Sequence, residues 1–193
     1  MRISSLVAGI ATVALMFGAA AANEFEGPIK NLANSEIKGW LKDPMIVGAV
    51  KAQNEQHASL SQGDIDRLDK QWRSEIGNGN RPLISKVMGN ALSGFLKKKA
   101  ETSQGLFSEI FVMDNKGLNV GQSAVTSDYW QGDEAKWKKT YLAGADAMHI
   151  GGVKKDESTQ AFQSQLSLPV VDPASNKVIG AITIGINVEQ LGQ

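Results

Sequence analysis

The sequence predicts an α+β fold, in which a long N-terminal helical segment precedes an antiparallel sheet of about five strands, with a short helix between strands two and three. Two observations predict it. Up to about residue 100, apolar residues recur at three- and four-residue steps, which is the spacing of one helical face. Beyond residue 105, β-branched and aromatic residues gather in short runs that turn-forming residues separate, as in strands.

The first 22 residues have the order of a secretory signal peptide. Arg2 precedes an apolar stretch over residues 6–17, and three alanines at 20–22 provide the small residues that a signal peptidase requires. The apolar stretch is too short to cross a bilayer comfortably, although an uncleaved membrane anchor is the alternative interpretation. We therefore expect a mature chain that begins near Asn23 and lies in the periplasm.

Helix start signals divide the helical segment. Pro28, Pro44 and Pro82 each suit the first position of a helix, and Ser61 with Asp64 forms a capping pair. We expect four helices, at residues 28–41, 44–57, 61–76 and 82–95.

The remaining elements are predicted from turns and alternation. Glu109–Met113 and Leu118–Gln122 flank a turn at residues 114–117, which predicts a β-hairpin. A helix is expected from Asp133 to Tyr141, because its start is acidic and its middle basic. Three further strands are expected at Ala147–Val153, Ala161–Val171 and Val178–Val188. Residues 23–100 would then form the helical segment and residues 101–193 the sheet, packed together as one domain.

Composition excludes several classes of site and partner. The chain has 0 cysteines, which excludes disulfides and thiolate metal sites, so stability must come from a hydrophobic core. With 20 Lys+Arg against 20 Asp+Glu, and with Lys97–Lys99 as the largest basic cluster, we expect no nucleic-acid partner.

Residues suited to catalysis are few. His57 and His149 are the imidazoles of the chain, and Ser123 lacks the second glycine of a nucleophile elbow. Asp64 and Asp66 would point to different sides of a helix, which does not suit a metal ion. We expect no cofactor, no metal and no catalytic activity. A periplasmic hydrolase that uses His149 is the weakest alternative.

The loop at residues 126–132 and the helix after it are the most informative stretch. In one helix the spacing of Trp130, Glu134, Trp137 and Tyr141 would place all four on one face, with Asp128 and Asp133 beside them. Such mixtures of aromatic and polar side chains occur in ligand pockets, although aromatic residues at helical spacing are also typical of a core. We expect a pocket here.

At these residues the chain resembles a known family. The hairpin at residues 110–117, the loop at 126–130 and the strand pair at 170–173 and 178–184 follow one another as in the extracytoplasmic PAS-like sensor family, the Cache or PDC domains. The resemblance covers about residues 82–191 and depends on the order and spacing of these segments.

This resemblance implies a module that binds a small molecule between the sheet and the loop-helix segment. By analogy, Tyr129, Trp130, Trp137 and Asp156 would line the pocket. Members that bind amino acids grip the carboxylate with an arginine, whereas this chain has no arginine after Arg81, and Lys136 is the nearest substitute. Nothing follows Gln193, so we expect a free-standing sensor that signals through a membrane receptor or kinase.

Together, these considerations define the expected function and site. Acidic and aromatic side chains near the pocket favour an amine or quaternary ammonium ligand. A structural or interaction protein without a ligand is the main alternative, and whether the helical segment packs on the sheet or forms a homodimer is left open. The expected ligand-binding residues are Asp128, Tyr129, Trp130, Asp133, Trp137, Tyr141 and Asp156.

Overall fold

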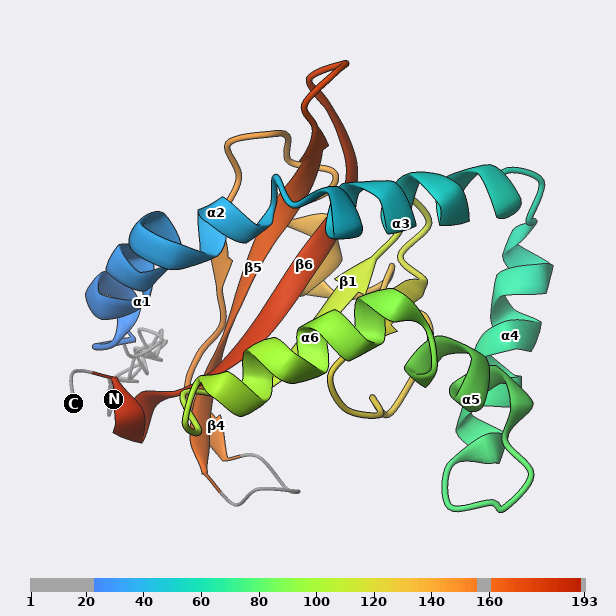
Figure 1. Ribbon diagram of the computed structural model, residues 1–193, viewed down its shortest axis with the longest axis horizontal. Coiled ribbons are helices and arrows are strands. Elements are labelled where there is room, and N and C mark those ends of the chain that lie inside the picture. Colours follow the sequence, from blue (N-terminus) through green and yellow to red (C-terminus); the bar gives the residue numbers. More distant parts are fainter. Residues whose placement is uncertain (1–22, 156–160, 192–193) are drawn as a thin grey trace, which may run out of the picture.

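The computed structural model describes residues 23–155 and 161–191, and Figure 1 shows how their elements are arranged. The predicted signal peptide and Asp156 lie outside these ranges. The N-terminal helices are α1 (Glu26–Leu32), the π-helical turn η1 (Ala33–Ile37), α2 (Lys38–Trp40), α3 (Pro44–Gln56), α4 (Gln62–Glu75), α5 (Pro82–Met88) and α6 (Ala91–Thr102). They are followed by β1 (Phe107–Met113), β2 (Asn119–Gln122), α7 (Ala135–Lys138), β3 (His149–Ile150), β4 (Lys154–Lys155), β5 (Phe162–Asp172), β6 (Lys177–Asn187) and the 3-10 turn η2 (Val188–Gln190).

The strands form one antiparallel sheet in the order β2-β1-β6-β5-β3, with β4 also paired to β5. The hairpin β5–β6 supplies the two long central strands, and Ile184 of β6 lies between Ile110 of β1 and Leu166 of β5. The predicted α+β fold, with helices before an antiparallel sheet and a short helix between strands two and three, is confirmed.

Helices cover one face of this sheet. Figure 1 shows α3 and α6 crossing the strands, with α1 and α2 continuing the line of α3. The main core lies between these helices and the sheet. Its fully or almost fully buried members include Ile29, Ile46, Val50, Leu96, Ile110, Leu166, Leu168, Ile182 and Ile184. The helical segment therefore packs alongside the sheet, because the sheet face and the helix faces bury one another.

The helices α4 and α5 form a second cluster beyond the β2 edge, where Figure 1 shows them to one side of the sheet. Trp72 of α4 is fully buried there against Tyr129, with the ring centroids 5.3 Å apart. The predicted capping pair of Ser61 and Asp64 is present at the start of α4, and Asp43 caps α3 by accepting from Met45 N–H.

Predicted elements of the helical segment and of the β3 edge differ from the structure. The helix expected over 82–95 is two helices, because Asn90 ends the first and caps the second by accepting from Ser93 N–H at 2.8 Å. The first predicted helix is interrupted by η1. The strand expected over 147–153 is reduced to β3, with β4 just beyond it. Within the described residues, no helix is long and apolar enough to span a membrane.

Candidate functional site

The loop over residues 123–134 crosses the sheet face that the helices leave open, and contacts from distant elements fix its path. Asp69 of α4 accepts from the backbone N–H groups of Tyr129 and Trp130 at 2.9 and 3.0 Å. Trp72 Nε1 donates to the carbonyl of Thr126 at 2.8 Å. Since these contacts hold Trp130 in extended backbone, where it bridges to Leu118, the residue lies outside any helix.

The predicted helical face of Trp130, Glu134, Trp137 and Tyr141 is therefore wrong. Helix α7 covers only Ala135–Lys138, so these residues do not share a regular helix. Trp130 Nε1 donates to Lys116 O, whereas Trp137 donates to Asp114 O and stacks on Tyr141 with centroids 4.7 Å apart.

The other predicted site residues separate to different parts of the molecule. Tyr129 is 3% exposed and points to the helical side, against Trp72, whereas Asp128 lies on the open side. Asp133 is exposed. The aromatic side chains of the loop-helix segment thus pack mainly as core, as the alternative interpretation of their spacing expects.

A polar groove lies on the open face of the sheet, beneath this loop and α7. It consists of two adjoining hollows of about 570 and 390 Å³, which share Lys136, Lys154, Gln163 and Gln165. Around these four, the lining side chains are polar or charged at Glu109, Thr126, Ser127, Asp128, Gln131, Glu134, Lys139, His149 and Lys155.

Strand alternation accounts for the polar floor. Gln163 and Gln165 of β5 point away from the core that Leu166 enters, because successive side chains of a strand face opposite sides. Gln165 Nε2 donates to Glu109 Oε1 at 2.8 Å, and Ser108 Oγ donates to Gln163 Oε1. These hydrogen bonds offset the cost of removing the amides and the carboxylate from water.

A glycine of β6 keeps the floor open. A Cβ at Gly185 would lie 2.6 Å from Gln163 Oε1 and 2.7 Å from Glu109 Cγ. Such distances are too short for a real contact, so any larger residue would displace the polar side chains. The groove floor therefore depends on Gly185 as well as on the polar residues.

Lys136 is the central cation of the groove. Its side chain is 14% exposed, with Nζ 3.0 Å from both Gln131 Oε1 and Glu134 Oε2 and 5.3 Å from the centroid of the Phe111 ring. The ammonium therefore already occupies the aromatic face that an amine ligand would use. Lys136 thus donates a hydrogen bond to Gln131 and forms an ion pair with Glu134, and these two contacts hold its ammonium in the groove.

Asp128 supplies negative charge at the other end of the groove. Its Oδ2 lies 3.4 Å from Arg73 Nη2, and its Oδ1 accepts from Gln131 Nε2. Gln131 thus bridges Asp128 and Lys136, so a network of hydrogen bonds sets the separation of the two opposite charges.

His149 borders the groove, and among residues 23–155 and 161–191 no hydroxyl beside it is both near its ring and open to a substrate. Burial lowers its pKa, and the charge of Lys139 lowers that pKa further. The hydroxyl opposite it in the sheet register belongs to Ser167, which is fully buried and lies 3.0 Å from Thr183 Oγ1. A nucleophile needs access to substrate as well as a base, and Ser167 lacks that access.

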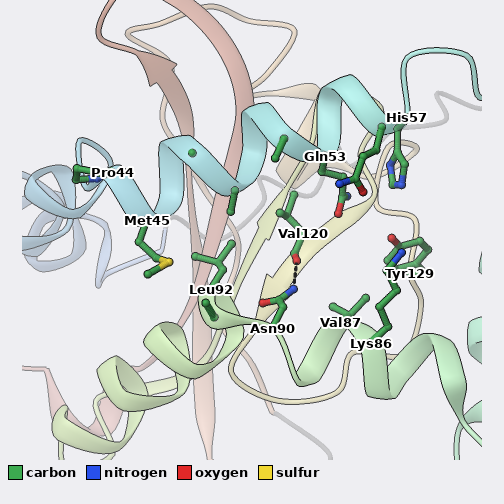
Figure 2. Close-up of a pocket in the computed structure, with 15 residues that line it drawn as sticks. Pro44, Met45, Gln53, His57, Lys86, Val87, Asn90, Leu92, Val120 and Tyr129 are labelled. Atoms are coloured by element: carbon green, nitrogen blue, oxygen red, sulfur yellow. Dashed lines mark hydrogen bonds between the residues drawn. The ribbon is translucent and has the colours of Figure 1, made fainter.

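A further hollow, of about 670 Å³, lies on the helical side between α3, α5 and α6 (Figure 2). Of the predicted site residues that the structure describes, Tyr129 lines it. His57 lies at one end, with Nδ1 2.8 Å from Oδ2 of the fully buried Asp114. The same carboxylate accepts from Gln53 and from the backbone N–H groups of Lys116 and Leu118.

Comparison with known proteins gives structural matches only, since no protein-family model and no curated protein matches the chain. The sensor domain of the V. cholerae histidine kinase DctB is 13% identical with a TM-score of 0.38, over 82% of this chain and 57% of that one. The ligand-binding domain of the Campylobacter jejuni chemoreceptor Tlp3, in complex with L-valine, is 12% identical with a TM-score of 0.40, over 86% and 65%.

The ligand-binding domain of the Pseudomonas aeruginosa amino acid chemoreceptor PctC, in complex with GABA, is 19% identical with a TM-score of 0.37, over 86% of this chain and 61% of that one. This chain therefore spans less than two thirds of the length of each of these domains. The chain is thus similar in structure to a sensor domain of a histidine kinase and to ligand-binding domains of two chemoreceptors.

Proposed function

We propose that this chain is a non-catalytic, extracytoplasmic sensor module that binds a small charged solute in the groove on the open face of the sheet. One observation carries the proposal: Lys136 and Asp128, of opposite charge, are held at fixed positions in the same groove by the shared partner Gln131. Ligand sites typically combine a concave shape with a few polar groups whose positions are fixed in advance.

The charges in the groove indicate the class of solute. Lys136 would pair with a carboxylate, and Asp128 or Glu109 would pair with a protonated amine. The amides of Gln163 and Gln165 supply further donors and acceptors. A solute that carries an amine together with an acidic group uses all of these, so we propose this class in place of the simple amine or quaternary ammonium ligand that the sequence favours.

A ligand-free interaction protein is the second candidate. The packing of Trp130, Trp137 and Tyr141 favours it, because those rings contribute to a core rather than to the groove lining. The two candidates differ in a measurable way: a ligand that binds only the folded state at one hundred times its dissociation constant stabilises it by about 2.7 kcal/mol, whereas an interaction protein gains nothing from solutes.

The test is a thermal-shift screen of residues 23–193, followed by calorimetry. The solutes are putrescine as an amine, 4-aminobutanoate and L-isoleucine as amino acids, and succinate as an organic acid. We expect an amino acid to bind best, and Asp128→Asn to weaken its binding about tenfold or more. Asp133→Asn removes the same charge from an exposed position outside the groove and is expected to change affinity less than about twofold.

Absence of binding by all four solutes would favour the interaction protein. Equal losses in Asp128→Asn and Asp133→Asn would show that the net charge of the surface, not the groove, attracts the solute.

Export and signalling complete the proposal. The order of residues 1–22 supports cleavage near Asn23, and a sensor module released into the periplasm would transmit its bound state through a membrane receptor or kinase. Mass spectrometry of periplasmic protein should find a mature N-terminus within one or two residues of Asn23. Full-length chain retained in the inner membrane would contradict this part of the proposal. A homodimer remains a prediction that light scattering would test.

A further inference from the structure

The hollow on the helical side has the form of a second binding site, separated from the groove by the sheet. Figure 2 shows its two walls, α3 on one side and α5 with α6 on the other, and Val120 of β2 between them. Its volume of about 670 Å³ lies within the range of small-molecule pockets.

Small residues on α3 explain why the hollow stays open. Gly48, Ala49 and Ala52 line it, and their side chains are too short to reach across to α6. At Gly48 a Cβ would meet no atom within 4 Å. Met45, at the end of the hollow next to Pro44, keeps 40% of its surface exposed. This end therefore offers apolar surface that no described part of the chain covers.

Hydrogen-bonding groups gather at the opposite end. Figure 2 shows Gln53 of α3 and His57, which follows α3, at the same end as Lys86 of α5 and Tyr129 of the loop over residues 123–134. Because a buried carboxylate only accepts hydrogen bonds, the contact with Asp114 places a proton on His57 Nδ1 and leaves Nε2 for a ligand. Burial raises the pKa of Tyr129, as does the charge of Asp114, so its hydroxyl remains a neutral donor.

The charge of the lining selects the head group of a ligand. Among the described residues that line the hollow, Lys86 is a cation and none is Asp or Glu. The negative charge of Asp114 lies behind His57 and Gln53, which both contact it. An acidic head group would therefore meet Lys86 and the Tyr129 hydroxyl, while the carboxylate of Asp114 is already hydrogen-bonded to His57 and Gln53.

We propose that this hollow binds an amphipathic monocarboxylate, with its carboxylate between Lys86 and Tyr129 and its apolar chain along Ala49, Leu92 and Met45. The proposal is independent of the groove, since the residues that carry it lie on the helical side of the sheet. Burial of an apolar chain against these side chains supplies most of the affinity, and the charged head group fixes its orientation.

The probe is decanoate, titrated into residues 23–193 by calorimetry below its micellar concentration, with decylamine as the same chain carrying the opposite charge. We expect one decanoate to bind per chain, more tightly than decylamine. Lys86→Gln should weaken decanoate binding about tenfold or more, because it removes the cation at the head group. Ala49→Leu should abolish binding by filling the middle of the hollow, and circular dichroism would check that this variant folds.

Lys98→Gln is the matched control, since Lys98 is an exposed lysine of α6 outside the hollow. Its affinity for decanoate should stay within about twofold of the parent chain. No decanoate binding, equal binding of decylamine, or equal losses in the two lysine variants would each overturn the proposal. So would a stable dimer that buries the hollow and excludes decanoate, because the occupant would then be a second copy.

Discussion

Along β5, Leu166 and Leu168 enter the core beneath the helices, while Gln165 and Ser167, one residue away, face the open side. The same alternation continues in β6. The helical face buries mainly apolar side chains, whereas the open face buries, beside the apolar cluster of Phe111, Met113, Trp137 and Ala181, polar groups that pair with one another. Apolar burial stabilises the fold without positioning any particular group, but a buried polar group must find a partner. The polar pairs of the open face therefore suit the recognition of a charged solute, and the apolar core beneath the helices stabilises the fold.

The largest loss of folding stability is expected at Trp72, where the loop over the open face is fixed to the helices. Trp72 is fully buried, stacks on Tyr129 and donates to Thr126 O. We expect Trp72→Ala to lower the free energy of unfolding by about 3 to 5 kcal/mol, measured in urea, because it empties a core position. Trp72→Phe keeps a ring and should cost less. A loss below about 1 kcal/mol for Trp72→Ala would show that this contact is not a core contact.

The second prediction compares how much the two faces contribute to the free energy of unfolding, at neighbouring positions of the sheet. Ile184 is fully buried under the helices, and Ile184→Ala should cost about 2 to 5 kcal/mol. On the open face, Ser167 and Thr183 contact each other through their hydroxyls. The double change Ser167→Ala with Thr183→Val removes both partners and should cost less than about 1 kcal/mol. Equal losses in urea unfolding would mean that the open face stabilises the fold as much as the helical face does.

The smallest change in folding stability is expected at the N-terminal cap of α4, which lies away from both faces of the sheet. Hydrogen bonds from the Ser61 side chain and backbone, together with Arg67, hold the pKa of Asp64 at about 2, below its ordinary value of 3.8. A lowered pKa means that the stabilisation is present above pH 3.8 and is lost as the pH falls through about 2. Asp64→Asn should therefore be less stable than the parent chain at pH 5, and this difference should shrink towards pH 2. A constant difference would contradict the assignment.

The fold could be predicted from local signals, where neighbours in the sequence determine the structure. Asp43 and Ser61 act as the caps that their positions indicate, and the hairpin forms around the predicted turn. The break at Asn90 could not be predicted from periodicity, because Leu92 and Phe95 continue the apolar spacing of the preceding helix. An asparagine side chain can cap a helix, bond within a turn or face solvent, and the sequence alone does not say which of these Asn90 does.

The candidate site was harder to predict, since long-range contacts form it. Asp69 holds the backbone of Trp130 across 61 positions of the sequence, which removes Trp130 from the predicted helix. The positions of Gln163 and Gln165 could have indicated the groove. Polar residues at every second position of a long central strand indicate a sheet face that is polar and covered by other parts of the chain. Lys136 was identified only as a substitute for a missing arginine, and its place in the groove depends on the tertiary contact with Gln131.

The most direct test of the central claim, that the open-face groove is the ligand site, compares two lysines of α7. Lys136 lies in the groove, and Lys138, two positions along the same helix, is exposed outside it. Calorimetry would measure the affinity of Lys136→Gln, of Lys138→Gln and of the parent chain for the amino acid that binds best in the screen. We predict that Lys136→Gln weakens binding about tenfold or more and that Lys138→Gln changes it less than about twofold. Unchanged affinity in Lys136→Gln, or the same loss in both variants, would contradict the account.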